Sequence, residues 1–300
     1  MRSFAFANQK GGVGKTTTAV NIGAFLAWQG RRVLLVDLDP QGNASASIGV
    51  NRFALPASVY DVFSGGATLR EILTPSVMEQ LTIVPSTPTL AGAEIELANV
   101  DGREFILRDA LNNAERSLPD EFDYALIDCP PSLGVLTVNA LSAADYVIVP
   151  VQCEYLALEG LAQLMQTIAL VRENLNPKLE LFGIVMTMFD PRARLASQVI
   201  QEVRAHFPNE LFETLIPRNV RVAEAPSFGE PLVKFDIHSR GAEAYEKLTN
   251  EFLMREARLG MGIRSQGLDE VIVVSNSPVS INATPTPEPQ PLSPVPTELQ

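Results

Sequence analysis

Short, nearly continuous apolar runs recur along the chain, with helical segments between them. Runs that lack polar alternation are typical of strands covered by helices on both faces. These runs predict strands over residues 3–8, 33–36, 81–84, 124–127, 146–151 and 181–186.

Three further stretches have the apolar spacing of amphipathic helices, and they cover residues 16–29, 161–171 and 239–258. The first is followed by Gly30, a typical helix stop. Strands that alternate with helices predict an α/β fold, namely a doubly wound, mostly parallel sheet with helices on both faces. In such sheets, ligands bind beyond the carboxyl ends of the strands.

The composition changes near residue 262. Beyond it lie Ser, Asn and Thr residues and many prolines, of which seven fall from Pro278 to Pro296. An acidic, proline-rich stretch favours extended polyproline II structure and cannot bury a core. The sequence therefore predicts one domain over residues 1–262 and a disordered tail over residues 263–300. The apolar run at residues 271–274 is open to two interpretations, a docking motif or an incidental run.

Composition and charge limit the possible functions. Of the 300 residues, 46% are apolar and 19% are charged, which indicates a globular protein. The net charge of −12 excludes a general nucleic-acid coat, so any DNA binding needs a local basic patch. No apolar run approaches the roughly 20 residues of a membrane span, and the N-terminal residues do not resemble a signal peptide. Cys129 and Cys153 lack CxxC spacing, which excludes a zinc ribbon or disulfide scaffold and indicates a reducing, cytoplasmic location.

A glycine-rich segment follows the first predicted strand and precedes the first predicted helix. It reads Gln9-Lys10-Gly11-Gly12-Val13-Gly14-Lys15-Thr16-Thr17. Glycines let backbone N–H groups turn inward around phosphate oxygens, and the helix N-terminus adds partial positive charge. Lys15 can reach the outer phosphates, and the Thr16 hydroxyl can ligate Mg²⁺. The segment therefore predicts a phosphate-binding loop with Mg²⁺ as cofactor.

The form of this loop resembles one family of P-loop proteins. It departs from the simple GxxxxGK[ST] pattern, because Gln9 stands where that pattern has glycine. It has instead the form KGGxGK[ST], the deviant Walker A motif, and resembles the partition and positioning ATPases that include ParA/Soj, MinD and the nitrogenase iron protein. The resemblance implies ATP as the nucleotide and a homodimer that sandwiches it. In that dimer Lys10 reaches the nucleotide of the partner subunit.

Acidic residues end two of the apolar runs. Asp37 and Asp39 follow the run at 33–36, and Asp128 follows the run at 124–127. Asp37 and Asp39 share a face if their strand continues. Asp128 fits a Walker B carboxylate that holds the Mg²⁺ shell, directly or through water. The resemblance implies that Asp39 positions or activates the attacking water and that Asp37 lies near the Mg²⁺ shell, so the metal residues are Thr16, Asp37 and Asp128.

Three further segments resemble ParA/Soj in particular, and they cover residues 39–43, 152–160 and 216–229. The resemblance implies that Pro217 packs on the adenine ring and that Asn219 offers its donor and acceptor to the base edge. The expected catalytic residues are Lys10, Lys15 and Asp39. The expected nucleotide-binding residues are Lys10, Gly11, Gly12, Val13, Gly14, Lys15, Thr16, Thr17, Pro217 and Asn219.

The function implied by this resemblance is a molecular switch for chromosome or plasmid partition. Family members of this short type bind DNA nonspecifically as ATP dimers and are released by slow hydrolysis, which a ParB-like centromere-binding protein stimulates. The implied location is the cytoplasm, on the nucleoid. Because arginine suits phosphate oxygens, the expected DNA contacts are Arg192, Arg194, Arg218 and Arg221.

Two other functions stay open at the level of sequence. A MinD-like membrane-associated ATPase is the first, because apolar residues and arginines mix over residues 252–264, as in a basic amphipathic helix. A metabolic P-loop enzyme is the second, but it needs a substrate pocket, and no further polar constellation suggests one. The segment Asp39-Pro40-Gln41-Gly42-Asn43 favours ParA/Soj over both.

Overall fold

One mixed sheet organises the part of the chain that the computed structural model describes, residues 1–117, 121–154 and 157–261. Its strand order is β3-β4-β2-β5-β1-β6-β7, and every neighbouring pair is parallel except β3 and β4. The predicted tail, residues 263–300, lies outside the described residues. The strands are β1 (Arg2–Phe6), β2 (Val33–Asp37), β3 (Thr74–Pro75), β4 (Leu81–Val84), β5 (Tyr124–Asp128), β6 (Tyr146–Gln152) and β7 (Glu180–Thr187).

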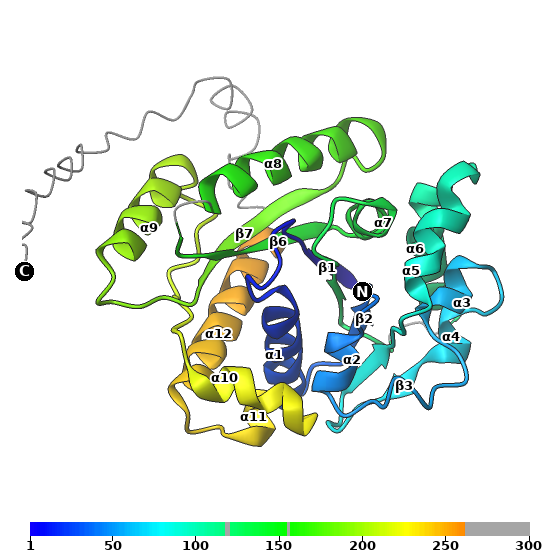
Figure 1. Ribbon diagram of the computed structural model, residues 1–300, viewed down its shortest axis with the longest axis horizontal. Helices are drawn as coiled ribbons and strands as arrows, with labels where there is room; N and C mark the ends of the chain where they lie inside the picture. The colour runs from blue at the N-terminus through cyan, green and yellow to red at the C-terminus, as the bar shows by residue number, and fades with distance from the viewer. Residues whose placement is uncertain (118–120, 155–156, 262–300) are drawn as a thin grey trace, which may run out of the picture.

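Helices cover both faces of the sheet, and Figure 1 shows α1 and α12 beside one another on one face and α8 on the other. The first face carries α1 (Lys15–Trp28), α2 (Asn43–Ser47), α10 (Val220–Glu224), α11 (Leu232–Phe235) and α12 (Arg240–Gly260). The second face carries α3 (Val59–Phe63), α4 (Leu69–Ile72), α5 (Leu90–Glu96), α6 (Ile106–Ser117), α7 (Val135–Ala143), α8 (Ala157–Asn174) and α9 (Arg194–His206). Short 3₁₀ turns are η1 (Leu97–Asn99), η2 (Arg103–Phe105) and η3 (Ala225–Phe228).

Side chains on the two faces of the central strands lie in two separate apolar cores. Along β1, Phe4 and Phe6 point to the core under α1 and α12, whereas Ala5 points to the core on the other face. The ring of Phe4 packs against Phe252 of α12, with ring centroids 4.7 Å apart. Because both faces are buried, these strands need apolar residues at every position, which is why the sequence shows runs rather than alternation.

The α/β class, the mostly parallel sheet and the six long strands are confirmed, with small differences at their ends. The strand predicted at residues 3–8 ends at Phe6, because Asn8 already belongs to the turn into the glycine-rich loop. There its side-chain oxygen accepts a hydrogen bond from the Lys10 backbone N–H at 3.0 Å. The predicted helices match α1, the inner part of α8, and α12.

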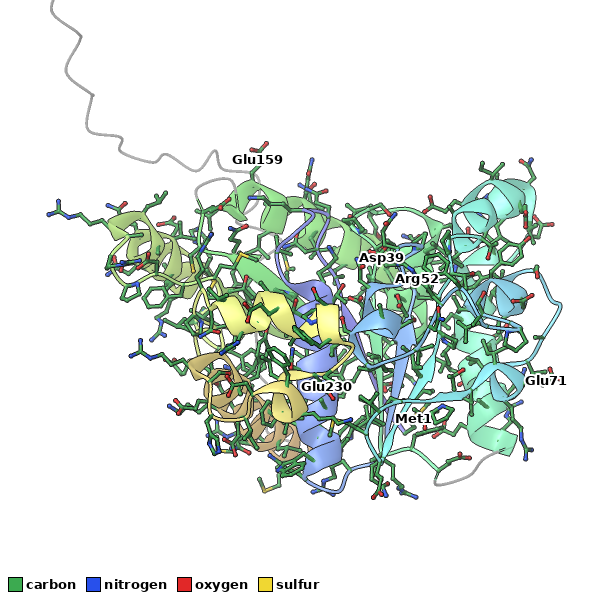
Figure 2. The ribbon with its side chains drawn as sticks, turned by 60° about the horizontal axis from the view of Figure 1, so that its bottom comes forward. Met1, Asp39, Arg52, Glu71, Glu159 and Glu230 are labelled. Atoms are coloured by element: carbon green, nitrogen blue, oxygen red, sulfur yellow. The ribbon has the colours of Figure 1, made fainter. Side chains whose placement is uncertain are left out.

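The carboxyl ends of three central strands meet at one edge of the sheet. β5 lies between β1 and β2, and its last residue, Asp128, is in register with both Phe6 and Asp37. The glycine-rich loop leaves the sheet directly beside this point. Figure 2 labels Asp39 at this edge and Met1 near the opposite edge, where the strands begin.

Candidate functional site

The loop between β1 and α1 has the backbone of a phosphate cradle. Gly12 and Gly14 adopt left-handed conformations, with φ of 73° and 90°, which L-residues with a side chain rarely adopt. The Thr187 hydroxyl at the end of β7 donates to the Val13 carbonyl at 2.8 Å and ties the loop to the sheet. α1 begins directly at Lys15, so its unpaired N–H groups face the loop.

Lys15 lies inside this cradle, and its side chain is almost fully buried. Its ammonium donates to the Lys10 carbonyl at 3.2 Å. Burial lowers the pKa of Lys15, and the nearby carboxylates of Asp128 and Asp39 partly oppose this effect. A buried cation with few partners of its own is well placed to meet an anionic ligand.

Asp128 is the most unusual group of the site. Its side chain has no solvent exposure, and neither carboxylate oxygen has a hydrogen-bond partner that meets normal geometry among the described residues. Burial raises the pKa of Asp128 well above its usual range, and the charge of Asp37 raises it further. The Thr16 hydroxyl and the Lys15 ammonium lie close enough to lower that pKa in part. Two orphaned buried oxygens beside a hydroxyl are suited to a cation shell.

Asp37 differs from Asp128, because its oxygens are already engaged. One oxygen accepts hydrogen bonds from the Ser45 backbone N–H at 2.8 Å and the Ser45 hydroxyl at 2.7 Å, and the other accepts from the Asp39 backbone N–H at 3.1 Å. Burial raises the pKa of Asp37 to about 6 against these donors. Asp37 therefore holds the segment between β2 and α2 in shape, next to Asp128.

Asp39 lies on that segment and is nearly buried. One of its oxygens accepts from the Gln41 backbone N–H at 2.9 Å, which closes a tight turn over Pro40. Figure 2 labels Asp39 and Arg52 in the same region of the molecule, and the Arg52 side chain packs against Gly42 of this turn. The turn thus holds one carboxylate at the mouth of the site, with its second oxygen left for a ligand or water.

Lys10 has a partner within its own subunit. Its ammonium forms an ion pair with Glu154 at 2.8 Å, and both side chains are partly exposed. Glu154 follows β6 and also accepts from the Gln152 amide at 2.5 Å. Another molecule that binds Lys10 therefore competes with this carboxylate for the ammonium.

The segment expected to bind adenine lies beside the same edge of the sheet. Phe189, just after β7, pairs with Pro217 in a parallel bridge, which places residues 216–219 next to the strand that holds the glycine-rich loop. Asn219 caps α10, because its side-chain oxygen accepts from the Arg221 backbone N–H at 2.8 Å. Its amide can therefore offer a donor to a base, while its acceptor serves the helix. The adenine role of Pro217 and Asn219 stays a prediction.

The four expected DNA-contacting arginines are all exposed, but they do not form one free cationic patch. Arg192 pairs with Asp190 through two hydrogen bonds of 2.9 and 3.0 Å. That contact, helped by the charge of Arg218, lowers the pKa of Asp190 to about 2. Arg221 pairs with Glu224 at 3.0 Å and Asp236 at 3.3 Å. DNA phosphates would have to compete with these carboxylates, although exposed pairs of this kind are weak.

Sequence reasoning missed three residues that shape the site: Ser45, Glu154 and Thr187. Glu154 and Thr187 are distant in sequence from Lys10 and Val13, whereas Ser45 lies eight residues beyond Asp37. Ser, Glu and Thr are common at surfaces and turns. Glu154 lies in the ParA/Soj-like segment 152–160, but the sequence of that segment does not indicate its partner; Tyr155 and Leu156 lie outside the described residues. No local pattern could have revealed these contacts.

The two cysteines are small core residues. Both are buried and free. Burial raises the pKa of the Cys129 thiol, and burial raises the pKa of Cys153 to about 11. Neither is a thiolate at neutral pH, so neither has the reactivity of a redox or metal-binding cysteine. No helix in residues 1–117, 121–154 or 157–261 has the length and hydropathy needed to cross a bilayer.

Replacing Asp128 by asparagine should stabilise the protein in the absence of nucleotide and Mg²⁺. The charges of Asp37 and Asp39 raise the pKa of the buried Asp128, and the Lys15 ammonium opposes them only in part, so removing one charge relieves both repulsion and desolvation. We expect a gain of about 2 kcal/mol at neutral pH, or roughly 6 °C in Tm for a domain of this size, measured by thermal unfolding.

The pH dependence of this gain follows from the raised pKa of Asp128. In the wild type, stability falls as pH rises from the unfolded pKa of about 4 through the raised folded pKa, because only the unfolded state ionises freely. The gain of Asp128→Asn should therefore be small at pH 4 and grow toward neutral pH. A difference that stays constant over this range would contradict a buried, charge-destabilised carboxyl.

These features define a class, the P-loop nucleotide-binding proteins with a doubly wound α/β sheet. A family model described as an AAA domain matches residues 1–181. Proteins of this class have a phosphate loop between the first strand and the first helix, and a carboxylate at the end of a neighbouring strand. Here Lys15 lies at the end of such a loop, and Asp128 ends the neighbouring strand β5.

Comparison with known proteins identifies the family within this class. The chain is 52% identical over 255 residues to the chromosome partitioning protein ParA of Myxococcus xanthus, covering 85% of this chain and 89% of that protein. It is 51% identical over 247 residues to the sporulation initiation inhibitor protein Soj of Bacillus subtilis, covering 82% and 96%. The chain belongs to the ParA/Soj family of chromosome partitioning ATPases.

A solved structure shares the fold along nearly the same length. It is the crystal structure of a cobyrinic acid a,c-diamide synthase from Mycobacterium smegmatis with a bound ATP analogue and magnesium. The TM-score is 0.74 at 42% sequence identity, and the match covers 87% of this chain and 97% of that one.

Proposed function

We propose that this chain is an ATP-dependent dimeric switch for chromosome or plasmid partition. It binds DNA nonspecifically in its ATP state and leaves it after slow, partner-stimulated hydrolysis. The observation that carries the proposal is the pair of orphaned Asp128 oxygens beside the glycine-rich loop, a site that needs a cation and phosphates to be complete. The names of relatives about half identical to this chain support the partition role.

ATP and Mg²⁺ fit the residues of this site. The described ranges contain no group of three His, Cys, Asp or Glu side chains able to hold a metal alone. Thr16 and Asp128 would hold Mg²⁺, and Asp37 lies beside them. When bound, Mg²⁺ supplies positive charge at the phosphate oxygens. The solved relative with an ATP analogue and magnesium supports this assignment.

In this proposal, different residues bind the phosphates, orient the attacking water and supply a cation to the partner subunit. The loop N–H groups from Gly11 to Thr17 orient the phosphates, and the Lys15 ammonium neutralises the outer ones. Asp39 orients the attacking water with the oxygen that Gln41 leaves unused. Lys10 adds a cation from the partner subunit, which makes hydrolysis depend on dimerisation. A ParB-like protein would accelerate this step.

The Lys10–Glu154 ion pair holds back that dimer. Because Lys10 must leave Glu154 to reach a second nucleotide, Glu154→Gln should strengthen ATP-dependent dimerisation. An exposed pair is worth about 0.5 kcal/mol, so the expected change is modest, and analytical ultracentrifugation with ATP and without hydrolysis measures it. Glu159→Gln, on an exposed residue that Figure 2 labels at the start of α8, is the matched control. Unchanged or weaker dimerisation of Glu154→Gln would contradict this role.

DNA binding tests the proposed function most directly. We expect binding with ATP and no binding with ADP, because one acidic subunit presents too few arginines and a dimer presents two sets. Arg192→Ala or Arg221→Ala should weaken binding without changing ATP affinity. Each should also flatten the log–log salt slope by roughly 0.9 for every DNA phosphate that the variant no longer neutralises. Fluorescence anisotropy on two duplexes of unrelated sequence at several salt concentrations measures this.

The control for these variants is Arg70→Ala. It removes an exposed arginine of α4, which directly precedes β3, the outermost strand on the side of the sheet away from β7. It should leave DNA affinity unchanged. Equal affinity with ADP and ATP, or strong preference for one short sequence, would contradict the proposal. ATP-dependent binding to anionic liposomes without DNA binding would favour the MinD-like function, and turnover of a small-molecule substrate would favour the metabolic one that the name of the solved relative suggests.

A further inference from the structure

Exposed apolar side chains gather where α1 and α12 end, on the edge of the sheet opposite the nucleotide site. Trp28 at the end of α1 is 62% exposed, and Met254 and Met261 of α12 are 57% and 68% exposed. Large apolar side chains exposed in one region mark interaction surfaces. We call these three residues, with Arg31 and Arg258, the helix-end patch.

The contacts between the two helices place the end of α1 beside the middle of α12. The Thr18 hydroxyl meets the Tyr245 hydroxyl at 3.3 Å, and the Gln29 amide donates to Asn250 at 3.0 Å, so the helices run in the same direction. Trp28 therefore lies at the level of Asn250. On α12, Met254, Arg258 and Met261 follow Asn250 at helical spacing along its exposed side.

The charge of the patch is positive. Arg31 and Arg258 are exposed and, among the described residues, neither forms an ion pair within 4 Å. Asp123, whose pKa the charge of Arg31 helps to lower, is bonded to Arg32 at 2.8 Å. On α12, Glu251 pairs with Arg255 at 2.9 Å, and Glu256 pairs with Arg2. A partner for this surface should therefore combine apolar side chains with acidic ones.

The chain itself supplies such a segment directly after the patch. Residues 268–274 read Leu268-Asp269-Glu270-Val271-Ile272-Val273-Val274, with two acidic and five apolar residues. Met261 ends the described part of the chain, and seven residues can span roughly 25 Å when extended. The exposed side of α12 from Asn250 to Met261 is only about 16 Å long. We propose that residues 268–274 dock on the helix-end patch.

Tethering makes a weak contact sufficient. A short linker holds the segment at an effective concentration in the millimolar range. An intrinsic dissociation constant of about 0.1 mM then leaves most molecules docked. Val271, Ile272 and their neighbours would cover Trp28 and the two methionines, while Asp269 and Glu270 face Arg31 and Arg258. The proposal is independent of the nucleotide chemistry, which lies at the other edge of the sheet.

The tryptophan makes this testable, because Trp28 is the single tryptophan of the chain. Acrylamide quenching of its fluorescence should be about twofold stronger in the full-length Ile272→Asp/Val274→Asp variant than in the wild type, with emission shifted to longer wavelength, as expected when most tethered segments undock. The matched control, Leu292→Asp/Val295→Asp, adds the same charge in the proline-rich part and should quench like the wild type. Arg258→Glu alters the patch instead and should also increase quenching.

Equal quenching of wild type and Ile272→Asp/Val274→Asp would overturn the proposal, as would an equal effect of the control. Shielding of Trp28 that rises with protein concentration would identify a second copy as the occupant instead. Shielding that requires phosphatidylglycerol vesicles would identify a membrane surface instead. Quenching that is independent of protein concentration and of vesicles, yet sensitive to residues 272, 274 and 258, supports docking of the tail.

Discussion

Lys10→Ala should bind ATP with nearly wild-type affinity yet hydrolyse it about 10³-fold more slowly at saturating protein, the reduction expected when a cation supplied by a partner subunit is removed. In the proposed mechanism Lys15 binds the phosphates within one subunit. Its ammonium donates to the Lys10 carbonyl, a backbone contact that alanine preserves. The Lys10 ammonium instead forms an ion pair with Glu154, so it does not take part in this contact of Lys15. Single-turnover hydrolysis and nucleotide titration, measured side by side, separate binding from chemistry.

The control is Lys178→Ala, which removes an exposed lysine between α8 and β7, away from the site. It should hydrolyse ATP at the wild-type rate. A Lys10→Ala protein that also does so would show that the lysine has no part in the reaction. A protein that no longer binds ATP would show instead that Lys10 acts within its own subunit, and either result rejects the role in the partner.

Asp39→Ala should trap the ATP-bound dimer. If Asp39 orients the attacking water as proposed, its removal should slow hydrolysis by about 10²–10³-fold. The proposed nucleotide contacts of the phosphate loop and Asp128 stay in place in this variant. The protein should therefore stay dimeric and bound to DNA long after the wild type has released it. Size-exclusion chromatography and DNA release kinetics after a single addition of ATP measure this lifetime.

The Asp39→Asn variant separates two roles of this carboxylate, the shaping of the turn and the activation of water. Asp39→Asn keeps an acceptor for the Gln41 backbone N–H, and so preserves the turn, but it removes the negative charge that draws a proton from water. Both variants should be slow if the charge matters. Wild-type hydrolysis by Asp39→Asn would restrict the role of Asp39 to shaping the turn, and faster hydrolysis by Asp39→Ala would exclude any catalytic part for it.

The central sheet could be predicted because burial on both faces leaves a strong local mark. Runs such as Val33–Val36 must be apolar at every position, and the structure buries all four of these residues. The short helices α2 to α5 could not be found this way, since five or so residues do not complete enough turns for a periodicity. β3 is only Thr74–Pro75 and is defined entirely by its pairing with β4.

The residues of the candidate site also fall into two groups, those that local sequence predicts and those that it does not. Residues adjacent in sequence, such as Gly14, Lys15 and Thr16, could be predicted because the loop and the helix start are local structures. Asp128 could be placed beside them, since parallel strands end at one edge. The bond that Thr187 makes to Val13 joins residues 174 positions apart in the chain. The bond from Ser45 to Asp37 spans only eight positions, but it joins α2 to the end of β2, and the turn between them determines it.

The Lys10–Glu154 contact has a consequence that depends on symmetry. A dimer in which each lysine crosses to the other subunit must open this contact twice, once on either side. Whatever factor one contact contributes to the association constant is therefore squared: about twofold for one exposed pair becomes roughly fourfold for the dimer. A small change in one surface carboxylate can thus set the protein concentration at which subunits assemble, with no residue of the phosphate loop altered.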